Sequence, residues 1–292
     1  MSVPQDGGDA APTPQARLSS DLGPRAASSI VMIAAALGTL WAGGDVFILF
    51  WLGCALALHW EWQGIIDAPQ FPARFFCGAF FLVLAVLLLR SGSLEWAFVA
   101  VALGAAALAW LAGPGKRIWA GSGLVYAASV VISVTLLRVL SRIDGVEAIL
   151  WLFAVVWGTD IMAYFGGRLI GGPKLWPRLS PSKTWAGFLV GVSSGGLLGL
   201  LCLALWPGAE PASLGALFVL GVLAGVIAQA GDFFESGVKR RFGVKDSSHL
   251  IPGHGGFMDR LDGFIAAAAF AALVGWIKSA GPGFVAIGLL RW

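Results

Sequence analysis

The chain has 292 residues, of which 58% are hydrophobic and 12% are charged. This charged fraction is about half that of an average soluble protein, so the composition excludes a soluble globular domain and predicts an integral membrane protein. The formal net charge of +3 is small and indicates no nucleic-acid partner, so the distribution of the charges matters more than their total.

The predicted elements begin with a disordered tail, residues 1–24, which is rich in Pro, Gln, Gly and Asp and lacks the apolar core of a signal peptide. Residues 25–292 form a single transmembrane domain. A helix needs roughly 20 apolar residues to cross a bilayer. We therefore expect an all-α polytopic protein with about nine spans, near residues 29–43, 45–63, 73–90, 94–113, 118–140, 146–169, 184–206, 212–235 and 260–279.

Two glycine patterns bear on these helices. Gly43 and Gly44 separate the first two spans, and the sequence leaves open whether they form a loop or a kink. Gly191, Gly195 and Gly199 recur every four residues in the seventh span, which predicts close packing against another helix of the same chain.

The basic residues indicate the orientation in the membrane. Of the 19 Lys and Arg residues, 14 lie in the N-terminal tail or in the loops after the second, fourth, sixth and eighth spans. Because cytoplasmic loops carry an excess of Lys and Arg, this side is predicted to be cytoplasmic. The two longest loops, residues 170–183 and 236–259, lie on it.

The first polar candidates in chain order lie around the sixth and seventh spans. Asp160 lies inside an apolar run, where an ionisable residue is a functional hypothesis by default, although Arg168 or a neighbouring helix could simply satisfy it. Ser182, Lys183 and Thr184 precede the seventh span, and a helix N-terminus can bind an anion. The alternative is an ordinary N-cap with a solvated lysine.

The eighth and ninth spans carry further carboxylates. Asp232, Ser236 and Lys239 are spaced by four and three residues, so they share one helical face. Asp259 and Asp262 are three apart and can point into a common cavity, although Asp259 could instead be a helix cap. Carboxylate oxygens of this kind are the hard ligands that magnesium prefers.

The connecting loop has the chemistry of a phosphate site. Arg240 and Lys245 join Lys239 as cations that can neutralise phosphates. Gly255 and Gly256 adjoin His254, and a glycine-rich backbone can turn successive N–H groups toward an anion.

The segment SGVKRRFGVKDSSHLIPGHGGFMDRLD resembles the signature of the CDP-diacylglycerol synthases, or phosphatidate cytidylyltransferases. Its fixed positions are Ser236, Lys239, Arg240, Lys245, Asp246, Pro252, His254, Gly255, Gly256, Asp259, Arg260 and Asp262. The resemblance implies a catalytic domain, richest in signature at residues 155–265, that condenses CTP with phosphatidate in a bacterial inner membrane. It leaves a homodimer open.

The resemblance, taken with the chemistry above, assigns roles. Asp232 and Asp259, with Asp262 or Asp160, are expected to hold Mg²⁺, with a second cation left open. The expected catalytic residues are Asp232, Ser236, Lys239 and Asp259, and the expected substrate-binding residues are Ser182, Lys183, Thr184, Arg240, Lys245, His254, Gly255, Gly256 and Arg260. Two departures from the family pattern stand out: Ala186 replaces an acidic residue, and Ile161 and Met162 replace a Thr-Gly pair.

Two alternatives fit less well. A CDP-alcohol phosphotransferase would share Asp259, Asp262, Gly263 and Ala266, but Ala267 stands where that family's motif has arginine, and no acidic residue follows. A transporter would explain Asp160 and Asp232 in the membrane, but not the cationic, glycine-rich loop between the last two spans.

Overall fold

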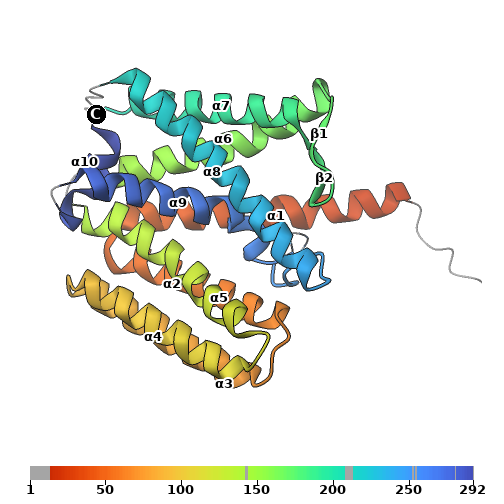
Figure 1. Ribbon diagram of the computed structural model, residues 1–292. Coiled ribbons are helices and arrows are strands. Elements are labelled where there is room, and N and C mark those ends of the chain that lie inside the picture. Colours follow the sequence, from red (N-terminus) through yellow and green to blue (C-terminus); the bar gives the residue numbers. More distant parts are fainter. Residues whose placement is uncertain are drawn as a thin grey trace, which may run out of the picture.

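The computed structural model describes residues 14–141, 144–207, 213–251, 253, 255–279 and 281–291, with side chains from residue 27 onward. Helices dominate these ranges (Figure 1). The α-helices are α1 (Pro14–Ala42), α2 (Gly44–Ile65), α3 (Phe71–Arg90), α4 (Leu94–Ala112), α5 (Arg117–Thr135), α6 (Gly145–Leu169), α7 (Trp185–Ala204), α8 (Leu214–Arg241), α9 (Met258–Lys278) and α10 (Val285–Leu290). A π-helical turn, η1 (Leu136–Leu140), extends α5, and a 3₁₀ turn, η2 (Pro282–Phe284), precedes α10.

The predicted polytopic all-α fold is confirmed. Within the described ranges, eight helices are long and apolar enough to cross a membrane: α2 to α9, with η1 counted as part of α5. Residues 27–42 of α1 form a shorter apolar helix. Together they account for the nine predicted spans.

The first two spans are separated by a loop rather than a kink. Gly43 lies between the end of α1 and the start of α2 with φ of +63°, a backbone conformation that residues with a side chain rarely adopt. A Cβ atom there would also lie 2.7 Å from Nη2 of Arg138, whose guanidinium donates to the carbonyl of Leu40. The backbone conformation therefore requires glycine at this position, and the absence of a Cβ atom leaves room for the Arg138 guanidinium.

The glycines of α7 pack against α6, as their spacing predicts. A Cβ atom at Gly191 would lie 2.7 Å from the carbonyl oxygen of Thr159, and one at Gly195 would lie 2.8 Å from that of Val155. Gly199 faces Trp151 one turn further along. We call this contact the glycine seam. It holds the backbones of α6 and α7 in direct contact, next to Asp160.

Three features differ from the sequence-based expectation. A short antiparallel hairpin, β1 (Lys174–Trp176) and β2 (Ser180–Thr184), occupies the predicted loop before α7. Helix α10 was not expected. Helix α1 begins at Pro14, so residues 14–24 of the predicted disordered tail are helical. Proline is tolerated in the first turn of a helix. Residues 1–13 lie outside the described ranges.

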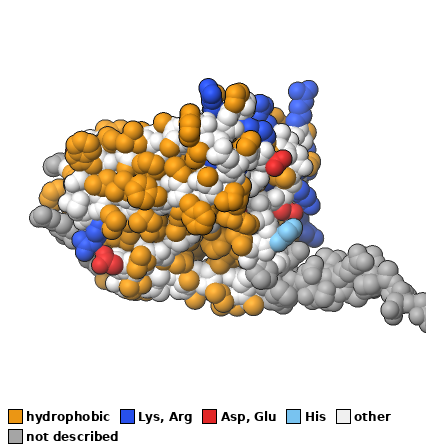
Figure 2. All heavy atoms as spheres, turned by 90° about the horizontal axis from the view of Figure 1, so that it is seen from below, with side chains coloured by type: hydrophobic (Ala, Val, Ile, Leu, Met, Phe, Trp, Pro, Cys, Tyr) orange, Lys and Arg blue, Asp and Glu red, His pale blue; other side chains and the backbone are white. Residues whose placement is uncertain are grey.

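The hairpin and the chain after α8 lie at the same end of the molecule (Figure 1). The last turn of α8 carries Lys239, Arg240 and Arg241, and Figure 2 shows Lys and Arg side chains gathered at this end beside a broad apolar flank. We call it the basic end. Both long loops that the sequence assigns to one side of the membrane therefore reach the same end.

An ion pair links the start of α6 to the chain after α10. Arg291 donates to both carboxylate oxygens of Asp144, at 2.9 and 3.2 Å. Burial alone raises the pKa of Asp144, but hydrogen bonds, above all those from Arg291, outweigh it and hold this pKa below its usual value. A carboxyl with a lowered folded-state pKa stabilises the fold above its unfolded-state pKa, and this stability is lost as pH falls through the folded-state value.

We therefore expect Asp144→Asn to lower the free energy of unfolding by on the order of 1 kcal/mol at neutral pH. The difference from wild type should shrink in acid. Thermal unfolding in detergent across a pH series measures this. Asp45→Asn, which breaks an exposed ion pair with Arg90, should change little at any pH. Equal effects of the two substitutions at neutral pH would contradict the prediction.

Candidate active site

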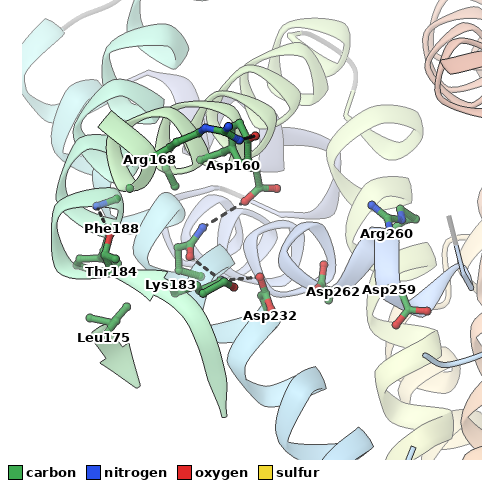
Figure 3. Close-up of a pocket in the computed structure, with 16 residues that line it drawn as sticks. Asp160, Arg168, Leu175, Lys183, Thr184, Phe188, Asp232, Asp259, Arg260 and Asp262 are labelled. Carbon is green, nitrogen blue, oxygen red and sulfur yellow. Dashed lines mark hydrogen bonds and ion pairs between the residues drawn. The ribbon is translucent and has the colours of Figure 1, made fainter. Parts of the chain in front are cut away.

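A cavity of about 590 Å³ opens between α6, the hairpin, α7, α8 and α9 (Figure 3). We call it the polar pocket. Its lining residues are Asp160, Ala163, Tyr164, Gly167 and Arg168 of α6; Leu175, Ser182, Lys183 and Thr184 of the hairpin; Gly187 and Phe188 of α7; Gln229 and Asp232 of α8; and Asp259, Arg260 and Asp262 of α9.

The structure thus brings together many of the residues that the sequence singles out. Asp160, Lys183, Asp232 and Asp262 come from four different elements and face one space (Figure 3). Asp232 and Asp259 line the same pocket, as the sequence analysis expects. Ser182, Thr184 and Arg260 complete the set of predicted residues in the lining.

The hairpin positions Lys183 by local structure. Thr184 is the N-cap of α7, and its hydroxyl accepts a hydrogen bond from the backbone N–H of Gly187 at 3.1 Å, which satisfies one of the orphan donors of the first turn. Pairing of Thr184 with Lys174 across the hairpin fixes the register of this segment. The N-cap alternative therefore holds for Thr184, whereas Lys183 is not merely solvated.

Lys183 lies at the centre of a charged network. Its ammonium contacts Oδ2 of Asp232 at 2.5 Å and donates to Oε1 of Gln229 at 2.7 Å. Nε2 of Gln229 in turn donates to Oδ1 of Asp160 at 3.2 Å. The ammonium also lies 4.8 Å from the ring centroid of Phe233. The chain Asp160–Gln229–Lys183–Asp232 fixes two carboxylates and one cation on the pocket wall.

Lys239 and Asp259 form a second network beside the pocket. Nζ of Lys239 lies 2.6 Å from Oδ1 of Asp259 and 2.7 Å from Oε1 of Glu235. Oδ2 of Asp259 accepts from the backbone N–H and hydroxyl of Ser247, at 2.9 and 2.8 Å, and from the N–H of Gly256 at 2.9 Å. Both oxygens of Asp259 therefore already have partners, and Lys239 lies between two carboxylates.

Three carboxylates come close enough to share a cation. Asp232, Glu235 and Asp262 each offer an oxygen, and these atoms all lie within 4.8 Å of one another. The side chain of Glu235 is almost completely buried. Three hard oxygen donors from two helices, in a partly buried position, are the donor chemistry of a divalent cation such as magnesium.

A second cavity, of about 430 Å³, adjoins the polar pocket. We call it the apolar cavity, because its walls are mainly aliphatic and aromatic side chains of α1, α2, α6 and α9. Asp160, Arg260 and Asp262 line both cavities. A molecule with a charged head and an apolar tail could therefore occupy the two together.

The remaining predicted residues lie outside the lining. Ser236 is 3.5 Å from Oδ1 of Asp232 through its hydroxyl, while Arg240 and Lys245 are exposed at the basic end. Gly255 and Gly256 lie in the loop that Asp259 holds, where Gly255 adopts a φ of +80°. The predicted His254 lies outside the described residues.

Sequence reasoning missed three residues of these networks. Gln229 bridges Lys183 and Asp160, Glu235 belongs to the three-carboxylate cluster, and the buried Glu61 of α2 contacts the loop after α8. The rule that singled out Asp160, a polar residue inside an apolar run, applies equally to Gln229 and Glu61. Glu235 lies three residues after Asp232 on the same face of α8, and this spacing could have indicated it.

Comparisons with known proteins give the family of this chain. The model of the cytidylyltransferase family matches residues 24–277. A phosphatidate cytidylyltransferase of Brucella abortus is 41% identical over 261 residues, which cover 88% of this chain and 94% of the relative. Two enzymes of the same name match shorter stretches. The one from Staphylococcus haemolyticus is 42% identical over 43% of this chain and 47% of its own length. The one from Rickettsia felis is 39% identical over 47% of this chain and 63% of its own length. With nearly the whole length covered, the chain belongs to the cytidylyltransferase family.

Proposed function

We propose that this protein is a phosphatidate cytidylyltransferase of a bacterial inner membrane, with its active site facing the cytoplasm. It condenses CTP with phosphatidate to give CDP-diacylglycerol and pyrophosphate. The junction of the polar pocket and the apolar cavity at Asp160, Arg260 and Asp262 carries the proposal, because the reaction joins a water-soluble polyanion to a lipid. The names of the relatives and the excess of basic residues on one side support it.

The lipid fits the apolar cavity. Its acyl chains would lie against side chains such as Met32, Phe153 and Phe264, which come from α1, α6 and α9. Its phosphate would then reach the junction, where Arg260 supplies positive charge. Burial of the chains contributes binding free energy away from the reacting atoms, and an enzyme can use such energy to orient its substrate.

CTP fits the polar pocket. Lys183 and Arg168 offer cations for its phosphates, and the Ser182 hydroxyl and the N-terminus of α7 lie on the same wall. An anion is stabilised at a helix N-terminus. The basic residues outside the pocket, Arg240 and Lys245, would attract the nucleotide toward the opening.

The reaction needs no covalent enzyme intermediate. A phosphate oxygen of phosphatidate attacks the α-phosphorus of CTP and forms a new P–O bond. The bond from that phosphorus to the oxygen bridging it to the β-phosphate breaks, and pyrophosphate leaves with the electron pair. The protein positions two polyanions and neutralises their charge, and Lys183 and Arg260 are placed to do this.

The donor set fits magnesium. Asp232, Glu235 and Asp262 would hold it, since their oxygens are close together and hard. A bound magnesium ion supplies positive charge that neutralises phosphate oxygens. Asp160 and Asp259, which the sequence analysis also proposed as ligands, lie beside this cluster with Gln229 and Lys239 as partners.

Pyrophosphate release tests the proposal against the transporter alternative. Full-length protein purified in detergent, mixed with CTP and magnesium, should release pyrophosphate only after phosphatidate is added. A chelator should stop the release, and added magnesium should restore it. A transporter would release none, and release that does not depend on phosphatidate would contradict the proposal. Release that survives the chelator would overturn the metal assignment alone.

A further inference from the structure

Glu61 is a buried acidic residue on α2, a helix that contributes no residue to the lining of the polar pocket. It lies in the last turns of α2, and 1% of its surface is exposed. An ionised carboxylate in such a position needs hydrogen-bond partners, because burial without them costs several kcal/mol. Its partners all come from the loop after α8 and the start of α9.

The carboxylate of Glu61 accepts three hydrogen bonds of its own and shares a fourth donor, the Ser247 hydroxyl, with Asp259. Oε1 accepts from the hydroxyl of Ser248 at 2.6 Å and from the backbone N–H of Phe257 at 2.8 Å. Oε2 accepts from the hydroxyl of Ser247 at 3.2 Å and from the N–H of Met258 at 2.7 Å. Two of these donors are N–H groups at the start of α9, which have no partner within the helix. One side chain thus joins the middle of the loop to its end at α9.

These contacts leave little capacity for chemistry at Glu61 itself. An ionised carboxylate has about four lone-pair sites, and three donors together with the shared Ser247 hydroxyl already face them. Glu61 also does not line the polar pocket. It is therefore neither a metal ligand nor a general base.

The loop connects Glu61 to the active site. The single hydroxyl proton of Ser247 is shared between Oδ2 of Asp259 at 2.8 Å and Oε2 of Glu61 at 3.2 Å, and the N–H of Gly256 donates to the same Asp259 oxygen at 2.9 Å. A Cβ atom at Gly256 would overlap both the Ser247 hydroxyl and the Glu61 carboxylate. The two carboxylates therefore hold the same part of the loop, with Ser247 between them.

We propose that Glu61 is a positioning residue for the cytidylyl transfer. By fixing Ser247, Ser248 and the first turn of α9, it sets the positions of Asp259, Arg260 and Asp262 in the polar pocket. This inference rests on the proposed function for the reaction, but the ordering of the loop can be measured without it.

The test is Glu61→Gln in the full-length protein. Each oxygen of Glu61 accepts from one backbone N–H, so a glutamine amide turns its NH₂ group against one of these N–H groups in either orientation. Loss of a buried hydrogen bond to a charged group corresponds to roughly a 10- to 100-fold effect. We expect kcat to fall by that factor, and amide hydrogen exchange in residues 247–259 of the metal-free protein to accelerate by at least about tenfold. Exchange in α3 and α4 should match wild type.

Glu95→Gln is the matched control, because Glu95 is exposed on α4, outside the polar pocket; it should leave both readouts unchanged. Glu61→Asp, which keeps the charge but shortens the reach, should give an intermediate result and replaces the glutamine variant if that one does not fold.

Normal exchange in the loop, or fast exchange with normal kcat, would overturn the proposal. Fast exchange throughout the helices would also overturn it, since Glu61 would then be a general stability residue. An inactive wild type would instead refute the proposed function, and the exchange comparison would still decide whether Glu61 orders the loop.

Discussion

Asp232→Asn should reduce phosphatidate-dependent pyrophosphate release by at least about 100- to 1000-fold, the size of effect seen when one charge-stabilising group is lost from an active site. Asp232 contacts Lys183 at 2.5 Å and is also one of the three carboxylates that could hold magnesium. Asparagine keeps the shape of the side chain but removes the charge that both partners need. Initial rates at saturating substrates, across a magnesium titration, measure the loss.

The stability of this variant separates catalysis from folding. Asp232 lies near Glu235 and Asp262, so removing its charge relieves repulsion among three carboxylates. We expect an unfolding temperature close to that of wild type, and a smaller rise on addition of magnesium. Asp45→Asn, a substitution of the same type in an exposed ion pair, should keep full activity. Near-normal turnover of Asp232→Asn at limiting magnesium would refute the role of Asp232.

The second large effect is expected for Lys183→Met. Methionine retains an unbranched apolar stem but has no charge. Asp232 would lose its cation and the nucleotide phosphates would lose theirs, so kcat/KM for CTP should fall by about 100- to 1000-fold. Steady-state kinetics with varied CTP measure this, and the KM for phosphatidate should change less.

Lys174→Met provides the control on the same hairpin. Lys174 is exposed, and its ammonium contacts only the carbonyl of Ser182, at 3.4 Å, among the interactions described for it. This variant should retain most of the wild-type activity, which would show that the loss in Lys183→Met is not a general effect of hairpin charge. Equal losses in the two variants would contradict the assignment of Lys183.

The sequence predicts the helices well because a membrane span needs a long apolar run, and that signal is local. The hairpin β1–β2 escapes prediction because its strands are short and mostly exposed, and their pairing has no apolar periodicity. Helix α10 also escapes prediction, because it has only six residues and no side-chain cap that the sequence could reveal.

The candidate site also combines residues that the sequence could predict with contacts that it could not. Asp160, Lys183 and Asp232 could be predicted, because each is a charged residue in or beside an apolar run. Their pairing through Gln229 could not, because that contact spans 69 residues to Asp160. Glu61 shows the limit most clearly: Ser248 is 187 residues away, and no spacing in the sequence indicates that they meet.

The glycine seam restricts how the molecule can deform. At Gly191 and Gly195 the backbone of α7 lies directly against carbonyl oxygens of α6, so sliding or separation of the two helices would break many contacts at once. Asp160 at one edge of the seam and Lys183 at the start of α7 thus belong to one rigid unit. We therefore expect any breathing motion that admits a two-chain lipid at the other walls of the apolar cavity, which α1, α2 and α9 form.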